Sequence, residues 1–197
     1  MKPFSEACER NREPILAVLR EAFAHVHEVL EIGSGTGQHA VYFARHLPHL
    51  AWRTSDLLAH HIGINAWIAD EALPNIELPI ALDVRDERWP LNSVDGVYTA
   101  NTLHIMDWPA VQAFFKGVGR VLGAGGVLAV YGPFNYGGRH TSASNERFDA
   151  DLRSRGVGSG LRDFEAVDAL AAAQGLVLEA DHAMPANNRT LVWRRSA

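Results

Sequence analysis

The chain has 197 residues, of which 47% are hydrophobic and 21% are charged. This length and balance are typical of a globular domain with a single core, so we expect residues 1–197 to fold as one domain. The formal net charge of -5 argues against a protein that binds nucleic acid mainly by neutralising phosphates. Acidic residues interrupt the nearby arginines Arg153, Arg155 and Arg162, which we therefore expect on a solvated surface.

Cysteine content and hydropathy bear on where the protein works. Cys8 is the only cysteine, so no internal disulfide can form and nothing indicates an oxidising compartment. Residues 1–14 carry several charges and no apolar core, a pattern unlike a secretory signal. No stretch approaches the roughly 18 uninterrupted apolar residues of a membrane helix. We expect a cytoplasmic protein without a membrane partner.

The segment ahead of the first strand has the spacing of an amphipathic helix. Apolar residues recur through residues 15–23 with a helical period. Asn11 is the predicted N-cap, and Pro14 is placed in the first turn, where proline is tolerated. We expect residues 1–28 to form a helical cap on the domain.

From Val29 onward, short β-branched or apolar runs alternate with longer helical patterns. Seven strands are predicted, at residues 29–32, 50–54, 78–82, 94–100, 127–131, 176–181 and 190–194. Helices are predicted at residues 38–46, 57–73, 109–122 and 164–174. This alternation favours a Rossmann-like α/β fold, with a mostly parallel seven-stranded sheet and helices on both faces. The short turn at 185–188 predicts a hairpin, which makes the last strand antiparallel to the others.

A polar, glycine-rich segment follows the fifth predicted strand. Residues 132–160 are too long for a simple turn, and loops of this length are usually lids or binding segments. We expect residues 132–162 to form a lid on the substrate side. A solvated loop without a ligand role is the alternative.

The strongest motif is the loop Glu31–Gly37, with the sequence EIGSGTG, between a predicted strand and a predicted helix. Its glycines allow sharp turns and close approach of a ligand, at the strand end where open α/β sheets bind their ligands. A dinucleotide fingerprint requires glycine at position 38, which is Gln38 here. A P-loop requires Gly-Lys-Ser/Thr at 38–40, where the chain has Gln-His-Ala. Both phosphate-binding interpretations therefore fail.

A Gly-x-Gly-x-Gly loop after an acidic strand end resembles motif I of the class I S-adenosylmethionine (SAM)-dependent methyltransferases. Asp56 follows the second predicted strand, where a carboxylate can accept hydrogen bonds from both ribose hydroxyls. Asp83 follows the third predicted strand, where this family places an acidic residue near the adenine amino group. Capping of a helix is the simpler alternative for each aspartate.

Four further stretches narrow the resemblance. They read ERNREPI at 9–15, ANTLHI at 100–105, YGPFNY at 131–136 and PANNR at 185–189. Together they resemble a methyltransferase-like family catalogued as a domain of unknown function, over nearly the whole chain. The resemblance implies SAM as the cofactor and methyl transfer as the activity, and it brings no settled substrate.

The resemblance also implies which residues hold SAM. They are Asn11, Glu31, Gly33, Ser34, Gly35, Gly37, Asp56, Asp83, Val84, Asn101 and Leu103. Asn11 belongs to the N-terminal cap, which packs over the cofactor in the resembled fold.

Three residues are candidates for work on the acceptor. His104 is the candidate general base, because neutral imidazole takes a proton near pH 7; packing beside the cofactor is its alternative role. Tyr136 is expected near the sulfonium, since an aromatic face stabilises a cation by about 0.5–2 kcal/mol. Arg139 is a candidate to hold an anionic or polar acceptor. Asn101–His104 differs from the Asn/Asp-Pro-Pro-aromatic motif of enzymes that methylate adenine or glutamine amides, so we expect a small-molecule acceptor.

Two other functions stay open at the level of sequence. A catalytically silent SAM-binding protein that acts through protein partners has the same sequence signals. A nicotinamide-dependent oxidoreductase is disfavoured by Gln38. The histidine pairs at 25/27 and 60/61 lack the supporting ligands of a zinc site, so no metal is expected. The oligomeric state is left open.

Overall fold

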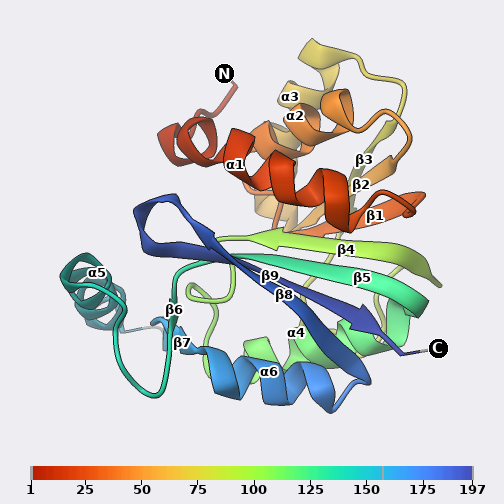
Figure 1. Cartoon of the computed structure of the whole chain (residues 1–197). Helices are drawn as coiled ribbons and strands as arrows, with labels where there is room; N and C mark the ends of the chain where they lie inside the picture. The colour runs from red at the N-terminus through yellow and green to blue at the C-terminus, as the bar shows by residue number, and fades with distance from the viewer. Residues whose placement is uncertain (1, 157, 197) are drawn as a thin grey trace.

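Two layers of helices enclose a central sheet in the computed structural model, which describes residues 2–156 and 158–196 (Figure 1). The helices are α1 (Glu6–Ala22), α2 (Gln38–His46), η1 (Leu58–His60), α3 (His61–Glu71), α4 (Trp108–Val121), α5 (Ala143–Ser154), α6 (Phe164–Ala172) and η2 (Pro185–Asn187). The strands are β1 (Glu28–Ile32), β2 (Ala51–Asp56), β3 (Ile76–Ala81), β4 (Val94–Ala100), β5 (Leu122–Gly132), β6 (Phe134–Asn135), β7 (Arg162–Asp163), β8 (Leu176–Met184) and β9 (Asn188–Arg195).

The central sheet has seven strands in the order β3-β2-β1-β4-β5-β9-β8. The pairs formed by β1 to β5 are parallel, whereas β9 runs antiparallel to both β5 and β8. Only η2 separates β8 from β9, and so short a connection joins antiparallel neighbours. The predicted Rossmann-like sheet with an antiparallel last strand is therefore confirmed.

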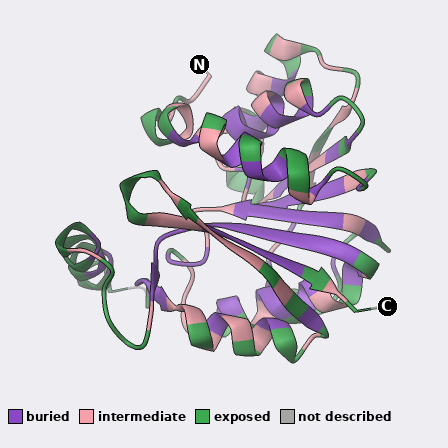
Figure 2. Cartoon of the chain, in the orientation of Figure 1, coloured by how far each residue is buried: buried purple, intermediate pink, exposed green. Residues whose placement is uncertain are grey.

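Apolar side chains alternate between the two faces of the central strands and so build two cores. Val97 of β4 and Leu128 of β5 face the core to which α4 and α6 contribute. Their neighbours Tyr98 and Ala129 face the opposite core, under α1 and α2. Figure 2 shows the same layering, with buried strands between helices that expose their outer faces. Helices on both faces leave the carboxyl ends of the parallel strands as the place for a ligand.

The N-terminal helix begins earlier than the sequence predicts. It starts at Glu6, and Ser5 caps it by accepting a hydrogen bond from the Cys8 amide. The predictions that Asn11 is the N-cap and that Pro14 lies in the first turn are therefore wrong. The apolar period that located this helix starts only at Ile15, because the first turns of α1 carry few buried apolar side chains.

The segment 132–160, expected to be an irregular lid loop, contains a helix. Ser142 caps α5 by accepting a hydrogen bond from the Asn145 amide, and the short strands β6 and β7 pair in parallel on either side of it. The sequence pattern missed α5 because Leu152 is its only buried apolar side chain. Arg162 of β7 is only 9% exposed, so the prediction that places it on a solvated surface is also wrong.

Other boundaries differ from expectation by a few residues. The helix predicted at 57–73 is divided into η1 and α3. The strand β5 begins at Leu122, several residues before its predicted start, because its pairing with β4 extends back to Val94 across an irregular register. These differences leave the predicted topology intact.

Candidate functional site

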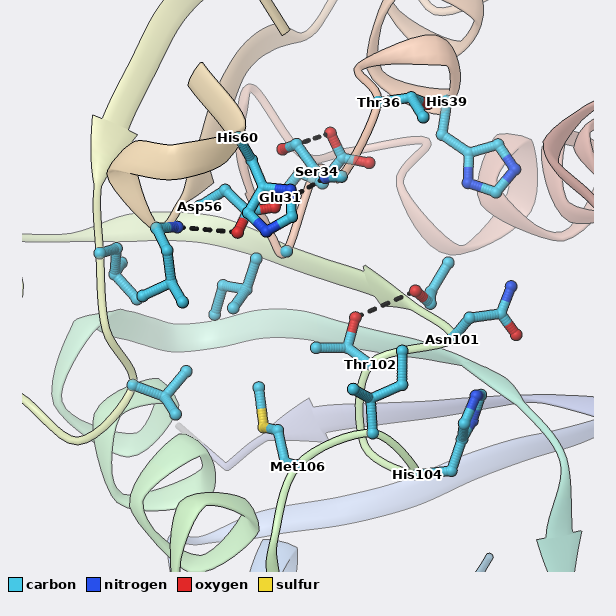
Figure 3. A pocket seen from close by; sticks show the side chains of 18 of the residues that line it. Glu31, Ser34, Thr36, His39, Asp56, His60, Asn101, Thr102, His104 and Met106 are labelled. Atoms are coloured by element: carbon cyan, nitrogen blue, oxygen red, sulfur yellow. Dashed lines mark hydrogen bonds between the residues drawn. The ribbon is translucent and has the colours of Figure 1, made fainter. Parts of the chain in front are cut away.

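A cavity of about 730 Å³ lies at the carboxyl ends of β1, β2 and β4, a volume that suits a small-molecule site. Figure 3 shows side chains from several loops and from α2 converging on it. The predicted cofactor residues that line it are Glu31, Gly33, Ser34, Gly35, Asp56, Asp83, Val84 and Asn101. Of the predicted catalytic residues, His104 lines the same cavity. The fold thus brings together residues from four separate segments.

The glycine loop after β1 is fixed against the end of β2. The amides of Gly33 and Ser34 each donate a hydrogen bond of 3.0 Å to the carbonyl of Ser55. Gly33 and Gly35 have φ angles of +73° and +57°, the left-handed region that favours glycine. A Cβ on Gly33 would lie 3.0 Å from Oγ1 of Thr102. Glycine at this position therefore lets the loop after β4 approach the loop after β1.

Three predicted cofactor residues lie behind the cavity wall. Gly37 caps α2 with a φ of +90° and packs against α3, where a Cβ would lie 2.9 Å from Cα of Ile64. Leu103 is buried in the core that α4 covers. Oδ1 of Asn11 lies 2.7 Å from Nε2 of His39, within hydrogen-bond distance, and His39 itself lines the cavity. These three residues support the site without facing it.

Glu31 places a buried carboxyl group in the cavity wall. It is 2% exposed, and its Oε2 accepts hydrogen bonds from Oγ of Ser34 at 2.9 Å and from Nε1 of Trp52 at 3.2 Å. Burial raises the pKa of Glu31 to about 7, although the hydrogen bonds from Trp52 and Ser34 act in the opposite direction. The charge of this wall therefore changes close to neutral pH.

Asp56 ends β2 and faces the glycine loop (Figure 3). Its Oδ2 accepts a hydrogen bond of 2.7 Å from the Gly35 amide, and its Oδ1 accepts one of 2.7 Å from the Leu57 amide. An ionised carboxylate offers about four lone-pair sites, so each oxygen can accept a further hydrogen bond. Asp56 is therefore oriented by the backbone and still able to bind a ligand.

The loop after β3 adds a charged edge to the cavity. Oδ1 of Asp83 accepts a hydrogen bond of 2.9 Å from the Arg85 amide. The Arg85 guanidinium lies 3.7 Å from Asp83 and donates to Asp107 at 3.0 Å. Val84, between these residues, is buried. This edge therefore combines the apolar side chain of Val84 with a carboxylate whose Oδ2 accepts no hydrogen bond from the residues that the structure describes.

The loop after β4 carries Asn101 and His104. Asn101 has a φ of +56°, which asparagine tolerates. Its backbone amide donates a hydrogen bond of 2.9 Å to the backbone carbonyl of Tyr131. The ring of Phe148 from α5 packs edge-on against His104, with ring centroids 5.4 Å apart. Within residues 2–156 and 158–196, no hydrogen bond engages either ring nitrogen of His104.

The imidazole of His104 is neutral at physiological pH. Burial, with a smaller contribution from the positive charge of Arg162, lowers the pKa of His104 to about 4. A neutral ring retains one nitrogen that accepts a hydrogen bond and one that donates. His104 can therefore orient a hydroxyl or amine that enters the cavity.

Tyr136 and Arg139 lie apart from this cavity. Their backbones exchange two hydrogen bonds of 3.0 Å, which form a tight turn after β6. The hydroxyl of Tyr136 donates a hydrogen bond of 2.8 Å to Asp181, and burial together with that carboxylate raises the pKa of Tyr136. Tyr136 lines a second cavity of about 360 Å³ beside Arg189. The structure therefore does not bring these two predicted catalytic residues next to His104.

Several lining residues had no signal in the sequence. Ser5 and Cys8 come from the start of α1, and His39 comes from the first turn of α2. Phe148 comes from α5, which the sequence pattern missed. Each of these residues reaches the cavity only through the packing of its helix, so no local motif marks it.

Two further findings concern the chain as a whole. Among the described residues, no group of three or more His, Cys, Asp or Glu side chains is placed to hold a metal ion. No helix in that part of the chain is long and apolar enough to span a bilayer.

The family described as "Protein of unknown function (DUF938)" matches residues 2–195. The chain belongs to this family. An O-methyltransferase family protein from Burkholderia thailandensis is similar to the DUF938 chain with a TM-score of 0.85 at 19% identity, over 98% of this chain and 58% of that one. The mitomycin 7-O-methyltransferase MmcR is similar with a TM-score of 0.83 at 19% identity, over 96% and 54%.

A third similar structure contains ligands. NcsB1, an O-methyltransferase from neocarzinostatin biosynthesis, was solved with SAM and 2-hydroxy-5-methyl naphthoic acid. It is similar with a TM-score of 0.78 at 20% identity, over 97% of this chain and 55% of that one. The DUF938 chain thus spans little more than half the length of these structures. The similarities show that it has the fold of the class I methyltransferases.

Proposed function

We propose that this DUF938 protein binds SAM in the large cavity and transfers its methyl group to a small-molecule acceptor. One observation carries the proposal: the glycine loop, Asp56 and Asp83 surround the same cavity at the carboxyl ends of neighbouring strands. The presence of SAM in the similar structure of NcsB1 supports the choice of cofactor.

The groups around the cavity suit a nucleoside with an amino-acid tail. Asp56 would accept hydrogen bonds from vicinal ribose hydroxyls, and Asp83 with the apolar Val84 would hold the adenine. Gly33 and Gly35 line the cavity and have no Cβ atoms that would take up space beside a ligand. Glu31 and Asn101 would hold the polar tail, and Asn11, Gly37 and Leu103 would support these residues from behind the wall.

When bound, SAM would supply a sulfonium-linked methyl group whose carbon a nucleophile attacks in line, and the S–CH3 electron pair would leave with the sulfur as S-adenosylhomocysteine. The chain then has to hold the acceptor at the methyl group and keep water out, and positioning of this kind can lower a barrier by several kcal/mol, up to about 7–11. The neutral ring of His104 accepts a hydrogen bond from the acceptor's hydroxyl or amine. Because a pKa of about 4 makes His104 a weak base, it takes the proton only as the nucleophile attacks.

The end of the cavity beside His104 is apolar. Ile105, Met106 and Phe148 line it, and the Ile105 side chain is 59% exposed. An exposed apolar wall favours an acceptor with an apolar face. NcsB1 was solved with a naphthoic acid, which supports this choice.

Two segments would cover the bound molecules. The cap, residues 1–28, contributes Ser5, Ala7 and Cys8 to the cavity, and the lid, residues 132–162, contributes Phe148. Glycines with positive φ lie on both sides of α5, at 137, 138, 156 and 158, which suits a segment that moves. The cytoplasmic location stays a prediction.

The first experiment is calorimetric titration of the whole chain with SAM, S-adenosylhomocysteine and NADH. The proposal expects the first two to bind and NADH not to bind. Incubation with methyl-labelled SAM and pools of small metabolites then tests transfer, with Asp56→Ala as the inactive variant and Asp151→Ala, on the exposed side of α5, as its control. Absence of SAM binding would overturn the proposal. Binding without transfer to any acceptor would favour the silent SAM-binding protein instead.

A further inference from the structure

The loop that carries His104 has no regular secondary structure to satisfy its backbone. Residues 101–107 join β4 to α4, and buried carbonyl groups in such a segment need donors from elsewhere. Nε of Arg162 donates a hydrogen bond of 3.0 Å to the carbonyl of Leu103, and Nη2 donates to that of Met106. The amide of Gly160 donates one of 2.9 Å to the carbonyl of His104. Residues 160–162 therefore fix the backbone on both sides of His104.

The guanidinium of Arg162 is used in an unusual way. It is buried, and the three hydrogen bonds that it makes within the described residues all end on backbone carbonyls, the third at 3.0 Å on Gly158. The central carbon of the guanidinium, Cζ, lies 6.0 Å from the centre of the Trp108 ring. Burying a charge is costly unless its hydrogen bonds are made, and here the bonds come from two separate nitrogens of a planar group, whereas lysine has a single donor nitrogen. Lysine could not reproduce this set of contacts.

The same segment is tied to α5. The Leu161 amide donates a hydrogen bond of 2.7 Å to Oδ1 of Asp149, and Oδ2 of Asp149 accepts from Arg153 at 2.8 Å and from His140 at 3.0 Å. Phe148, the neighbour of Asp149, packs against the ring of His104. Both the backbone and the ring of His104 are thus held by parts of residues 140–162.

We propose that Arg162 is a positioning residue for methyl transfer, whose guanidinium holds the loop Leu103–Met106 so that His104 faces the acceptor. The inference rests on the proposed function. Arg162 does not line the cavity, so it acts through His104 and not on the substrate. The charged and titratable groups that face Arg162 are His104, Arg153, Asp107 and Asp149.

The test compares Arg162→Met and Arg162→Lys with Arg155→Met, which changes an exposed arginine that forms an ion pair with Asp151. Three quantities are measured: the SAM dissociation constant, kcat and KM for the acceptor, and the titration of His104 by NMR, assigned with His104→Asn. We expect SAM binding to stay within about twofold. We expect kcat to fall by about tenfold to a hundredfold, because displacing a reacting group by about 1 Å can reduce the rate by up to about a hundredfold. The pKa of His104 should rise above its value in the native chain.

The Arg162→Lys variant retains the charge and loses the fork. It should fold even where Arg162→Met is unstable, and its kcat should fall nearly as far as that of Arg162→Met. Unchanged kcat in both variants, together with an unchanged His104 titration and ring environment, would overturn the inference. If the native chain transferred no methyl group, the proposed function would fail. The His104 titration and chemical shifts would then still decide whether Arg162 holds this loop.

Discussion

The backbone amide of Gly35 donates a hydrogen bond of 2.7 Å to Oδ2 of Asp56. The two residues belong to the loop after β1 and to the end of β2, so the contact joins the two sequence features that most strongly indicated a nucleoside site. Asp56 is oriented by the protein itself. A ligand that uses this carboxylate therefore meets a group that is already in place, which reduces the entropic cost of binding.

Removal of the Asp56 carboxylate should weaken cofactor binding. We expect Asp56→Ala to raise the SAM dissociation constant by about tenfold to a hundredfold, the effect of losing hydrogen bonds to a charged group. Asp56→Asn keeps one acceptor oxygen, so its SAM dissociation constant should lie between those of the native chain and of Asp56→Ala. Calorimetry gives the constants. An affinity of Asp56→Ala equal to that of Asp151→Ala would contradict the assignment of Asp56 to the ribose.

Substitution of Gly33 tests the close approach of two loops. Gly33→Ala places a Cβ at a φ of +73° and 3.0 Å from Oγ1 of Thr102, so it should destabilise the fold by about 1–3 kcal/mol in urea unfolding. Thr102→Ala removes the atoms that the new Cβ would meet. In that background the cost of Gly33→Ala should fall to about 1 kcal/mol, the part due to backbone strain. Equal costs in both backgrounds would show that the loops are not in contact.

The stability of the chain should depend on the ionisation of Glu31. Its folded pKa of about 7 lies above the usual 4.5, so its contribution is fully present below about pH 4.5 and is lost as pH rises through about 7. Glu31→Gln cannot ionise. The native chain should lose about 2–3 kcal/mol more stability than Glu31→Gln between about pH 5 and about pH 8, as measured by urea unfolding. Parallel pH profiles for the two proteins would show that Glu31 is not buried as described.

His39 should have the opposite dependence on pH. Burial lowers the pKa of His39 to about 4, below the usual 6.5, so its contribution is present above about pH 6.5 and is lost as pH falls through about 4. Between about pH 7.5 and about pH 4.5 the native chain should lose about 2–3 kcal/mol more stability than His39→Gln. His25→Gln, at an exposed position, serves as the control and should follow the native profile. If His39→Gln also follows it, then His39 is not buried in its neutral form.

Local pattern was sufficient for the sheet and for one half of the site. Strand β4 was predicted with its observed ends, and β1 and β5 were located within a few residues, because each carries a short cluster of β-branched or other apolar residues that the sheet buries. The loop Glu31–Gly37 and Asp56 could be found because each lies at the carboxyl end of a strand, and the carboxyl ends of parallel strands meet at one edge of the sheet.

Local pattern failed where side chains reach the site from helices with a weak apolar period. The first turns of α1 and most of α5 are polar, so hydrophobic periodicity misplaced the start of one helix and missed the other. Tyr136 and Arg139 were predicted for the site from their residue types, yet Tyr136 lies against Asp181 and lines the second cavity, and Arg139 is not among the residues that line the first.

The order of elements, the glycine loop and the carboxylates at strand ends were determined by the sequence, since each depends on contacts between residues near one another in the chain or on a repeat that the chain itself contains. Only the tertiary structure decided which residues surround His104. Phe148, Gly160 and Arg162 lie 44 or more residues away from it, and nothing in the local sequence of Arg162 distinguishes a buried guanidinium that binds carbonyls from a solvated one. Its role follows from the donors that an irregular buried loop requires, and that requirement exists only once the chain has folded.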